Sequence, residues 1–100
     1  MSLPVVMRPE ARSEFDDAVD WYELHRPGLG ADFVAHVQEV FDQISTTPRL
    51  YSPIFQNVRR AVVRRFPHLI LYKIEPQQVV VLAVFHSKRD PKIRRQRAVE

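Results

Sequence analysis

The apolar side chains of this 100-residue chain repeat with a helical period up to Pro48 and form strand-like runs after it. Apolar residues spaced at i, i+3, i+4 and i+7 form one stripe on a helix, whereas short β-branched runs are typical of strands. The two helical stripes consist of Phe15, Ala18, Val19 and Tyr22, and of Phe33, Val37, Val40, Phe41 and Ile44. This single change of period restricts the chain to helices first and a sheet second.

The boundaries of these elements follow from their breakers. Pro9 suits the first turn of a helix, which predicts a helix over residues 9–25. The only two glycines, Gly28 and Gly30, mark a tight turn that needs a positive φ or close packing. The second helix ends at residues 45–48. We therefore expect a helical hairpin.

The strands are predicted from valine-rich runs. Residues 5–7 form a short first strand, and residues 58–66, 69–74 and 79–85 form three more, joined by hairpins. The run 79–85 is continuously apolar, which predicts a central strand covered on both faces. Residues 48–56 read as a loop. The expected class is α+β, in the order β-αα-βββ, with the helical hairpin on one face of a small, mainly antiparallel sheet.

Charge is divided unevenly along the chain. Residues 1–50 carry a balance of −5 and residues 51–100 a balance of +8, and arginines outnumber lysines by twelve to three. Such asymmetry favours a basic surface that binds a polyanion or an acidic partner. The absence of cysteine excludes disulfides and thiolate chemistry. With no apolar run of membrane-spanning length and no signal peptide, we expect a cytoplasmic protein without a membrane partner.

Four arginines mark the first of the later strands. Because strand side chains alternate, Arg60 and Arg64 are expected on one face of that strand, with Arg59 and Arg65 completing the group. Four cations on one strand are costly to bury, so they indicate either a solvated face or a binding surface for phosphate or carboxylate. The tail from Ser87 onward adds more, and we expect it to form a short helix or a disordered arm.

A possible catalytic group combines Tyr72, His86 and Arg89 with the arginine strand. A tyrosine, a histidine and several arginines are the parts needed for acid–base cleavage of RNA. The alternative interpretation is that Tyr72 belongs to the core and that His86 caps a backbone carbonyl. The four histidines lack metal-ligand spacing, so neither a metal site nor a cofactor is expected.

Taken together, the sequence resembles the RelE/ParE superfamily of toxins, in its ParE-like plasmid-stabilisation branch. The resemblance spans residues 5–91 and implies one toxin domain over residues 1–91, a basic tail over 92–100 and a cognate antitoxin as partner. A homodimer is also left open. The resembling residues are Pro9-Glu10-Ala11, Trp21-Tyr22-Glu23, Pro27-Gly28-Leu29-Gly30, Phe33, Arg59-Arg60, Arg65-Phe66-Pro67-His68, Tyr72 and His86-x-x-Arg89-Asp90-Pro91.

The resemblance leaves three functions open. ParE-like toxins resemble inhibitors that bind DNA gyrase, RelE-like toxins resemble ribosome-dependent mRNA endoribonucleases that need no metal, and a non-toxic binding module could share the fold. RelE-like nucleases tend to carry extra lysines and arginines on their helices, and the acidic helices here contain no lysine, so the resemblance favours gyrase inhibition over ribosome-dependent cleavage. The candidate catalytic residues are Arg65, Tyr72, His86 and Arg89. The candidate residues for binding a partner or nucleic acid are Arg59, Arg60, Arg64, Arg65, Arg89, Arg94 and Arg95.

Overall fold

The computed structural model describes residues 2–88 as two helices and a five-stranded sheet. The elements are β1 (Val5–Met7), α1 (Pro9–His25), α2 (Leu29–Thr46), β2 (Pro53–Phe55), β3 (Val58–Val62), β4 (His68–Ile74) and β5 (Val79–His86). The expected tail over residues 92–100 lies outside the described residues.

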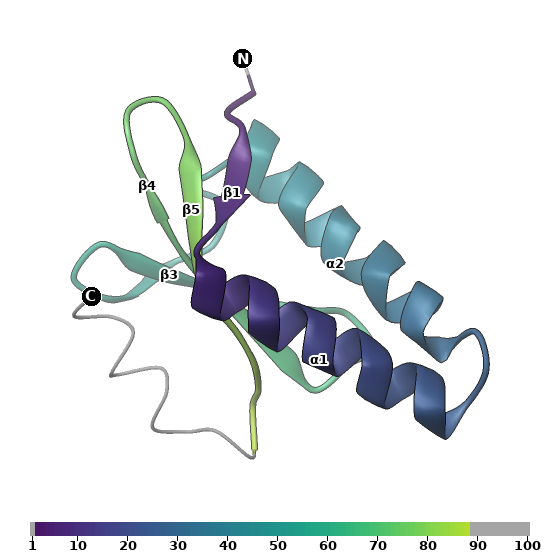
Figure 1. The fold of residues 1–100 in the computed structure, drawn as a ribbon. Coiled ribbons are helices and arrows are strands. Elements are labelled where there is room, and N and C mark those ends of the chain that lie inside the picture. Colours follow the sequence, from purple (N-terminus) through teal and green to yellow (C-terminus); the bar gives the residue numbers. More distant parts are fainter. Residues whose placement is uncertain (1, 89–100) are drawn as a thin grey trace.

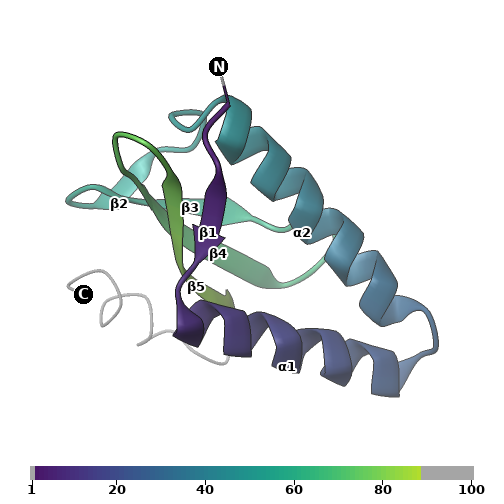
Figure 2. The same ribbon diagram turned by 45° about the horizontal axis from the view of Figure 1, so that its top comes forward.

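The sheet has the strand order β1-β5-β4-β3-β2. β1 runs parallel to β5, and every other neighbouring pair is antiparallel. The two helices lie side by side along one side of the sheet (Figure 1), with β2 on the side remote from them (Figure 2). The expected α+β class and the helical hairpin on a mainly antiparallel sheet are therefore confirmed.

Both helices form where the apolar stripes predict them. α1 starts with Pro9 in its first turn and turns Ala11 and Tyr22 into the core. α2 buries the stripe that begins at Phe33 and ends at Ile44. These side chains pack against one face of the sheet in a single core cluster. Their burial removes apolar surface from water, which is the main favourable term in folding.

The turn between the helices uses both glycines, as predicted. Gly28 has a φ of 89°, in the left-handed region that side chains with a Cβ rarely adopt. The Glu23 carboxylate accepts the backbone N–H of Gly28 at 2.9 Å and that of Gly30 at 3.0 Å. One acidic side chain of α1 thus satisfies two backbone N–H groups at the N-terminus of α2.

β5 is buried on both faces, as its continuous apolar sequence predicts. Its residues from Val79 to Phe85 are all buried. Val79, Val81 and Val84 face the helices. On the opposite face a second cluster forms from Val58, Leu71, Val80, Leu82, Ala83 and Phe85. Both faces of the sheet therefore carry a cluster of buried apolar side chains.

The β3 region differs from its prediction. The strand expected over residues 58–66 ends at Val62, and residues 63–67 form the turn to β4. Arg65 has a φ of 70° in that turn, a conformation incompatible with a continuing strand. The expectation that Arg60 and Arg64 share a strand face is therefore wrong. The valine-rich sequence predicted a strand as far as Phe66. In the structure the hairpin closes before that residue, through a hydrogen bond from the Val63 N–H to the His68 carbonyl oxygen.

The segment expected to be a loop contains the edge strand β2. All three of its residues are exposed, and they pair with β3 through Pro53↔Arg59 and Phe55↔Val58. A three-residue exposed strand leaves no alternating apolar pattern to detect. β2 is a strand because it pairs with β3, and the sequence of β2 alone does not encode that pairing. The sheet therefore contains one strand more than predicted.

We predict that Gly30→Ala destabilises the helical hairpin. A Cβ at this position would lie 2.9 Å from both the Glu23 Oε1 atom and the Val19 carbonyl oxygen. Relieving that overlap separates α1 from α2 and should lower the free energy of unfolding by about 1–3 kcal/mol in urea denaturation. Ala31→Ser, at an exposed neighbouring position, is the control and should stay within about 0.5 kcal/mol of the wild type. Equal stability of all three proteins would contradict the close approach.

Candidate functional site

The residues predicted to bind or react divide between two ends of the sheet. At one end, the turn that carries Arg64 and Arg65 lies beside the end of β5. His86 pairs across the strands with His68, and the Ser87 N–H donates to the Pro67 carbonyl at 2.8 Å. The backbone therefore places Arg64, Arg65 and His86 at the same end of the sheet, although Arg64 and Arg65 are not on a strand.

Tyr72 lies away from that group. At about 3.3 Å per residue, four positions along β4 separate Tyr72 from His68 by roughly 13 Å. Its side chain is fully buried on the helix-facing side, and its hydroxyl donates to the Pro48 carbonyl at 2.7 Å. The structure thus does not bring Tyr72 together with His86, and its hydroxyl is engaged in holding a loop.

The surroundings of Tyr72 also oppose a role as a base. Burial raises the pKa of the Tyr72 phenol above its ordinary value of 10.0, and the nearby Arg59 guanidinium lowers it only in part. A general base needs a pKa near the working pH, which a buried, neutral phenol does not have. The core interpretation of Tyr72 fits this environment.

The two paired arginines of β3 face opposite sides of the sheet. Arg59 is half-buried beside Tyr72 and donates to the Tyr51 carbonyl. Arg60 pairs with Leu71 on the other face and is exposed. Arg64 forms an exposed ion pair with Glu39 of α2 at 3.3 Å, a contact of small energetic value.

The arginines expected to bind a partner thus lie on different faces of the molecule. Arg60, Arg64 and Arg65 are exposed, whereas Arg59 is fixed in the structure by its bond to the loop. Arg89, Arg94 and Arg95 lie outside the described residues.

Two residues at the His86 end were not identified from the sequence as functional. Tyr22 of α1 and His68 of β4 form a hydrogen bond between the phenol oxygen and Nδ1 at 3.1 Å. His68 is only 4% exposed, and its ring lies 5.4 Å from the ring of His86, centre to centre. A pattern within one segment of the sequence cannot show that His68 contacts Tyr22, because the two residues are 46 positions apart in the chain.

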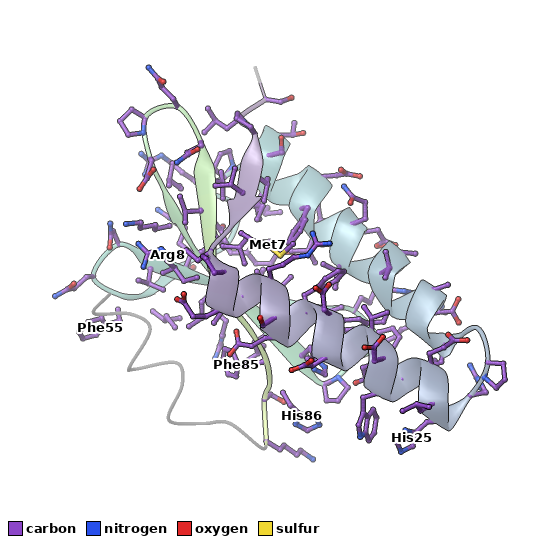
Figure 3. The ribbon with its side chains drawn as sticks, viewed as in Figure 1. Met7, Arg8, His25, Phe55, Phe85 and His86 are labelled. Carbon is purple, nitrogen blue, oxygen red and sulfur yellow. The ribbon has the colours of Figure 1, made fainter. Side chains whose placement is uncertain are left out.

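Aromatic rings enclose this polar pair. Phe33 and Phe66 pack against the Tyr22 ring at 5.1 and 5.0 Å. His86 lies at the border of the cluster, half-buried, where its Nδ1 accepts the Lys88 backbone N–H at 3.1 Å. In Figure 3, His86 stands at the end of β5, well apart from Phe55 on the other side of the sheet. His86 is therefore a partly exposed imidazole at the end of the sheet where the turn of Arg64 and Arg65 lies.

Neither a metal centre nor a membrane span is found in the described part of the chain. No group of three or more histidine, aspartate or glutamate side chains in residues 2–88 is arranged to hold a metal ion. None of the helices in these residues combines the length and apolarity needed to cross a bilayer.

We predict that Tyr72→Phe weakens the fold. Loss of the hydroxyl leaves the Pro48 carbonyl without its donor and should lower the free energy of unfolding by about 1 kcal/mol. The raised pKa means that the unfolded chain ionises Tyr72 first. The stability that this tyrosine contributes is therefore full below about pH 10 and falls as the pH rises above it.

Urea denaturation across that alkaline range measures both effects, since the wild type should lose stability more steeply than Tyr72→Phe. Expression of the phenylalanine variant should affect the growth of cells as the wild type does. A changed effect on growth with unchanged stability would contradict the structural role.

Comparisons with known proteins agree with this architecture. The family model described as the ParE toxin of the type II toxin–antitoxin system, parDE, matches residues 5–91. No curated protein matches the chain. A chain of the chromosomal ParDE toxin–antitoxin system from P. aeruginosa superposes with a TM-score of 0.73 at 13% identity, over 85% of this chain and 96% of that one.

A second solved structure is the toxin–antitoxin complex RelBE2 from Mycobacterium tuberculosis. The match has a TM-score of 0.61 at 25% identity and covers 86% of this chain and 92% of that one. The family match extends from β1 to beyond the end of β5, so it includes every described helix and strand. The chain belongs to the ParE toxin family and is a toxin of a type II toxin–antitoxin system.

Proposed function

We propose that this toxin inhibits cell growth by binding a protein target, with DNA gyrase as the leading candidate, and that it does so without cleaving RNA. The observation that carries the proposal is the burial of Tyr72, whose hydroxyl bonds to the Pro48 carbonyl. Removing this phenol from the candidate catalytic group leaves a basic surface suited to binding. The cognate antitoxin silences the toxin by occupying its binding surfaces.

The distribution of charge supports a binding mode over nucleic-acid cleavage. α1 and α2 contain no lysine, and several of their exposed side chains are acidic. A nuclease must hold a polyanionic backbone over a surface larger than its reacting group, chiefly through phosphate contacts. Here an extended RNA would meet the acidic hairpin beside the His86 end.

A second candidate function is ribosome-dependent cleavage of mRNA. One observation favours it: the backbone places Arg64, Arg65 and His86 at the same end of the sheet. A histidine can transfer protons near neutral pH, and two arginines can stabilise the charge that develops on phosphate. This endoribonuclease would need no metal.

The two functions predict opposite results for the purified toxin. Under the gyrase proposal it should inhibit DNA supercoiling, leave mRNA on translating ribosomes intact, and retain its inhibition in His86→Gln. Under the nuclease alternative, His86→Gln and Arg65→Ala should each lower cleavage by about 10²–10⁴-fold, the usual contribution of acid–base catalysis. Arg26→Ala in the interhelical turn is the matched control and should behave as wild type in both assays.

The outcomes separate cleanly. Cut mRNA that disappears in the His86 and Arg65 variants would overturn the gyrase proposal. Unchanged growth on expression without the antitoxin would contradict both toxic functions and leave a non-toxic binding module of the same fold.

A further inference from the structure

A groove opens at the end of the sheet opposite the His86 site. It has a volume of about 500 Å³ and lies between the loop before β2, the β2–β3 turn and the β4–β5 turn. Its lining combines two arginines, two side-chain amides, one carboxylate and apolar side chains: Arg49, Arg59, Gln56, Asn57, Glu75, Pro53, Ile74 and Pro76. The proposed gyrase and nuclease activities assign no role to this groove.

The electrostatics of the groove favour an anion. Arg49 and Arg59 contribute two positive charges. The one acid, Glu75, is already engaged by the Gln78 amide at 2.8 Å and by the Lys73 ammonium at 3.5 Å. Hydrogen bonding to Gln78, with a smaller contribution from Lys73, lowers the pKa of Glu75 and keeps it ionised and paired. The two arginines are therefore only weakly compensated.

Arg59 is positioned before any ligand binds. It is half-buried, and one of its terminal nitrogens donates to the Tyr51 carbonyl, which leaves the rest of the guanidinium fork available. Tyr51 is itself held by a hydrogen bond from its hydroxyl to the Gln43 side chain at 2.7 Å. A fixed guanidinium loses little conformational entropy on binding and matches the two oxygens of a carboxylate.

Exposed apolar residues directly follow or precede groove-lining residues in the chain, at an open edge of the sheet. Leu50 is 56% exposed, Ile54 38% and Phe55 41%. Ile54 and Phe55 belong to β2, the last strand of the sheet, so its outer edge has no neighbouring strand among the described residues. An apolar strand edge invites pairing with another chain, and natural proteins usually cover or charge such an edge. This edge is suited to an added segment.

We propose that the groove and the outer edge of β2 together bind an acidic segment of the cognate antitoxin, with a carboxylate between Arg49 and Arg59 and apolar side chains against Leu50, Ile54 and Phe55. The proposal rests on the toxin–antitoxin assignment and not on the identity of the cellular target. A peptide is favoured over RNA because the exposed side chains next to the groove are apolar, and apolar side chains on a peptide can pack against them.

Calorimetric titration of the full-length toxin with the purified antitoxin, as encoded beside it, tests the site. Arg49→Glu and Ile54→Ser should each raise the Kd by about tenfold or more, because they reverse a charge and remove an apolar contact at the centre of the interface. Each has a matched control away from the groove: Arg26→Glu for the exposed charge and Leu24→Ser for the exposed aliphatic side chain. Circular dichroism confirms that every variant is folded.

Each outcome decides the question. Weakened binding in the groove variants alone, with a salt dependence that decreases in Arg49→Glu, supports the proposal. Equal loss in Arg26→Glu would mean diffuse charge attraction and would overturn it, as would unchanged affinity in all variants. Loss of affinity for labelled single-stranded RNA, with antitoxin binding intact, would assign the groove to nucleic acid. Gyrase inhibition is measured separately, so failure of that proposal leaves this test unaffected.

Discussion

A strand buried on both faces has no water to satisfy its backbone, and this constraint on β5 organises the rest of the molecule. β4 pairs with β5 along its length on one side, apart from a bulge at Leu82, but β1 pairs on the other side only as far as Val81. There the chain leaves the sheet and begins α1 at Pro9. Five residues later, the Glu14 carboxylate accepts the N–H of Val84 at 3.1 Å. A helix side chain thus satisfies a backbone N–H of β5 beyond the point where the pairing with β1 ends.

That arrangement also explains why the helical hairpin must lie where it does. α1 has to stay beside β5 for the Glu14 carboxylate to reach the strand edge. α2 can pack closely against α1 because Gly30 carries no Cβ where the two helices meet. The tip of the hairpin then brings Tyr22 over His68. The Glu14 and Tyr22 contacts thus both hold α1 against the end of the sheet that carries His68 and His86.

At the opposite end, polar side chains that have the chemistry of a catalytic group serve to fasten a loop. Tyr72 holds the Pro48 carbonyl, Arg59 holds the Tyr51 carbonyl, and the Tyr51 hydroxyl bonds to Gln43. Tyrosine and arginine are enriched at both catalytic and binding sites, so residue type alone does not separate these roles. The loop that they fix forms one wall of the arginine groove, so a structural arginine also orients a binding surface.

The sequence by itself determined both helices, the turn glycines, β1, the buried character of β5 and the uneven charge, because each depends on the period or composition of a short stretch of chain. It also carried the family resemblance, since the order of such local features is what a family shares. The ends of β3 and the existence of β2 were decided by strand pairing, which local periodicity does not encode. The roles of Tyr72 and His68 were decided by partners 24 and 46 residues away. Only the tertiary structure brings such groups into contact, and these contacts decide whether a polar side chain stabilises the fold or is available for binding.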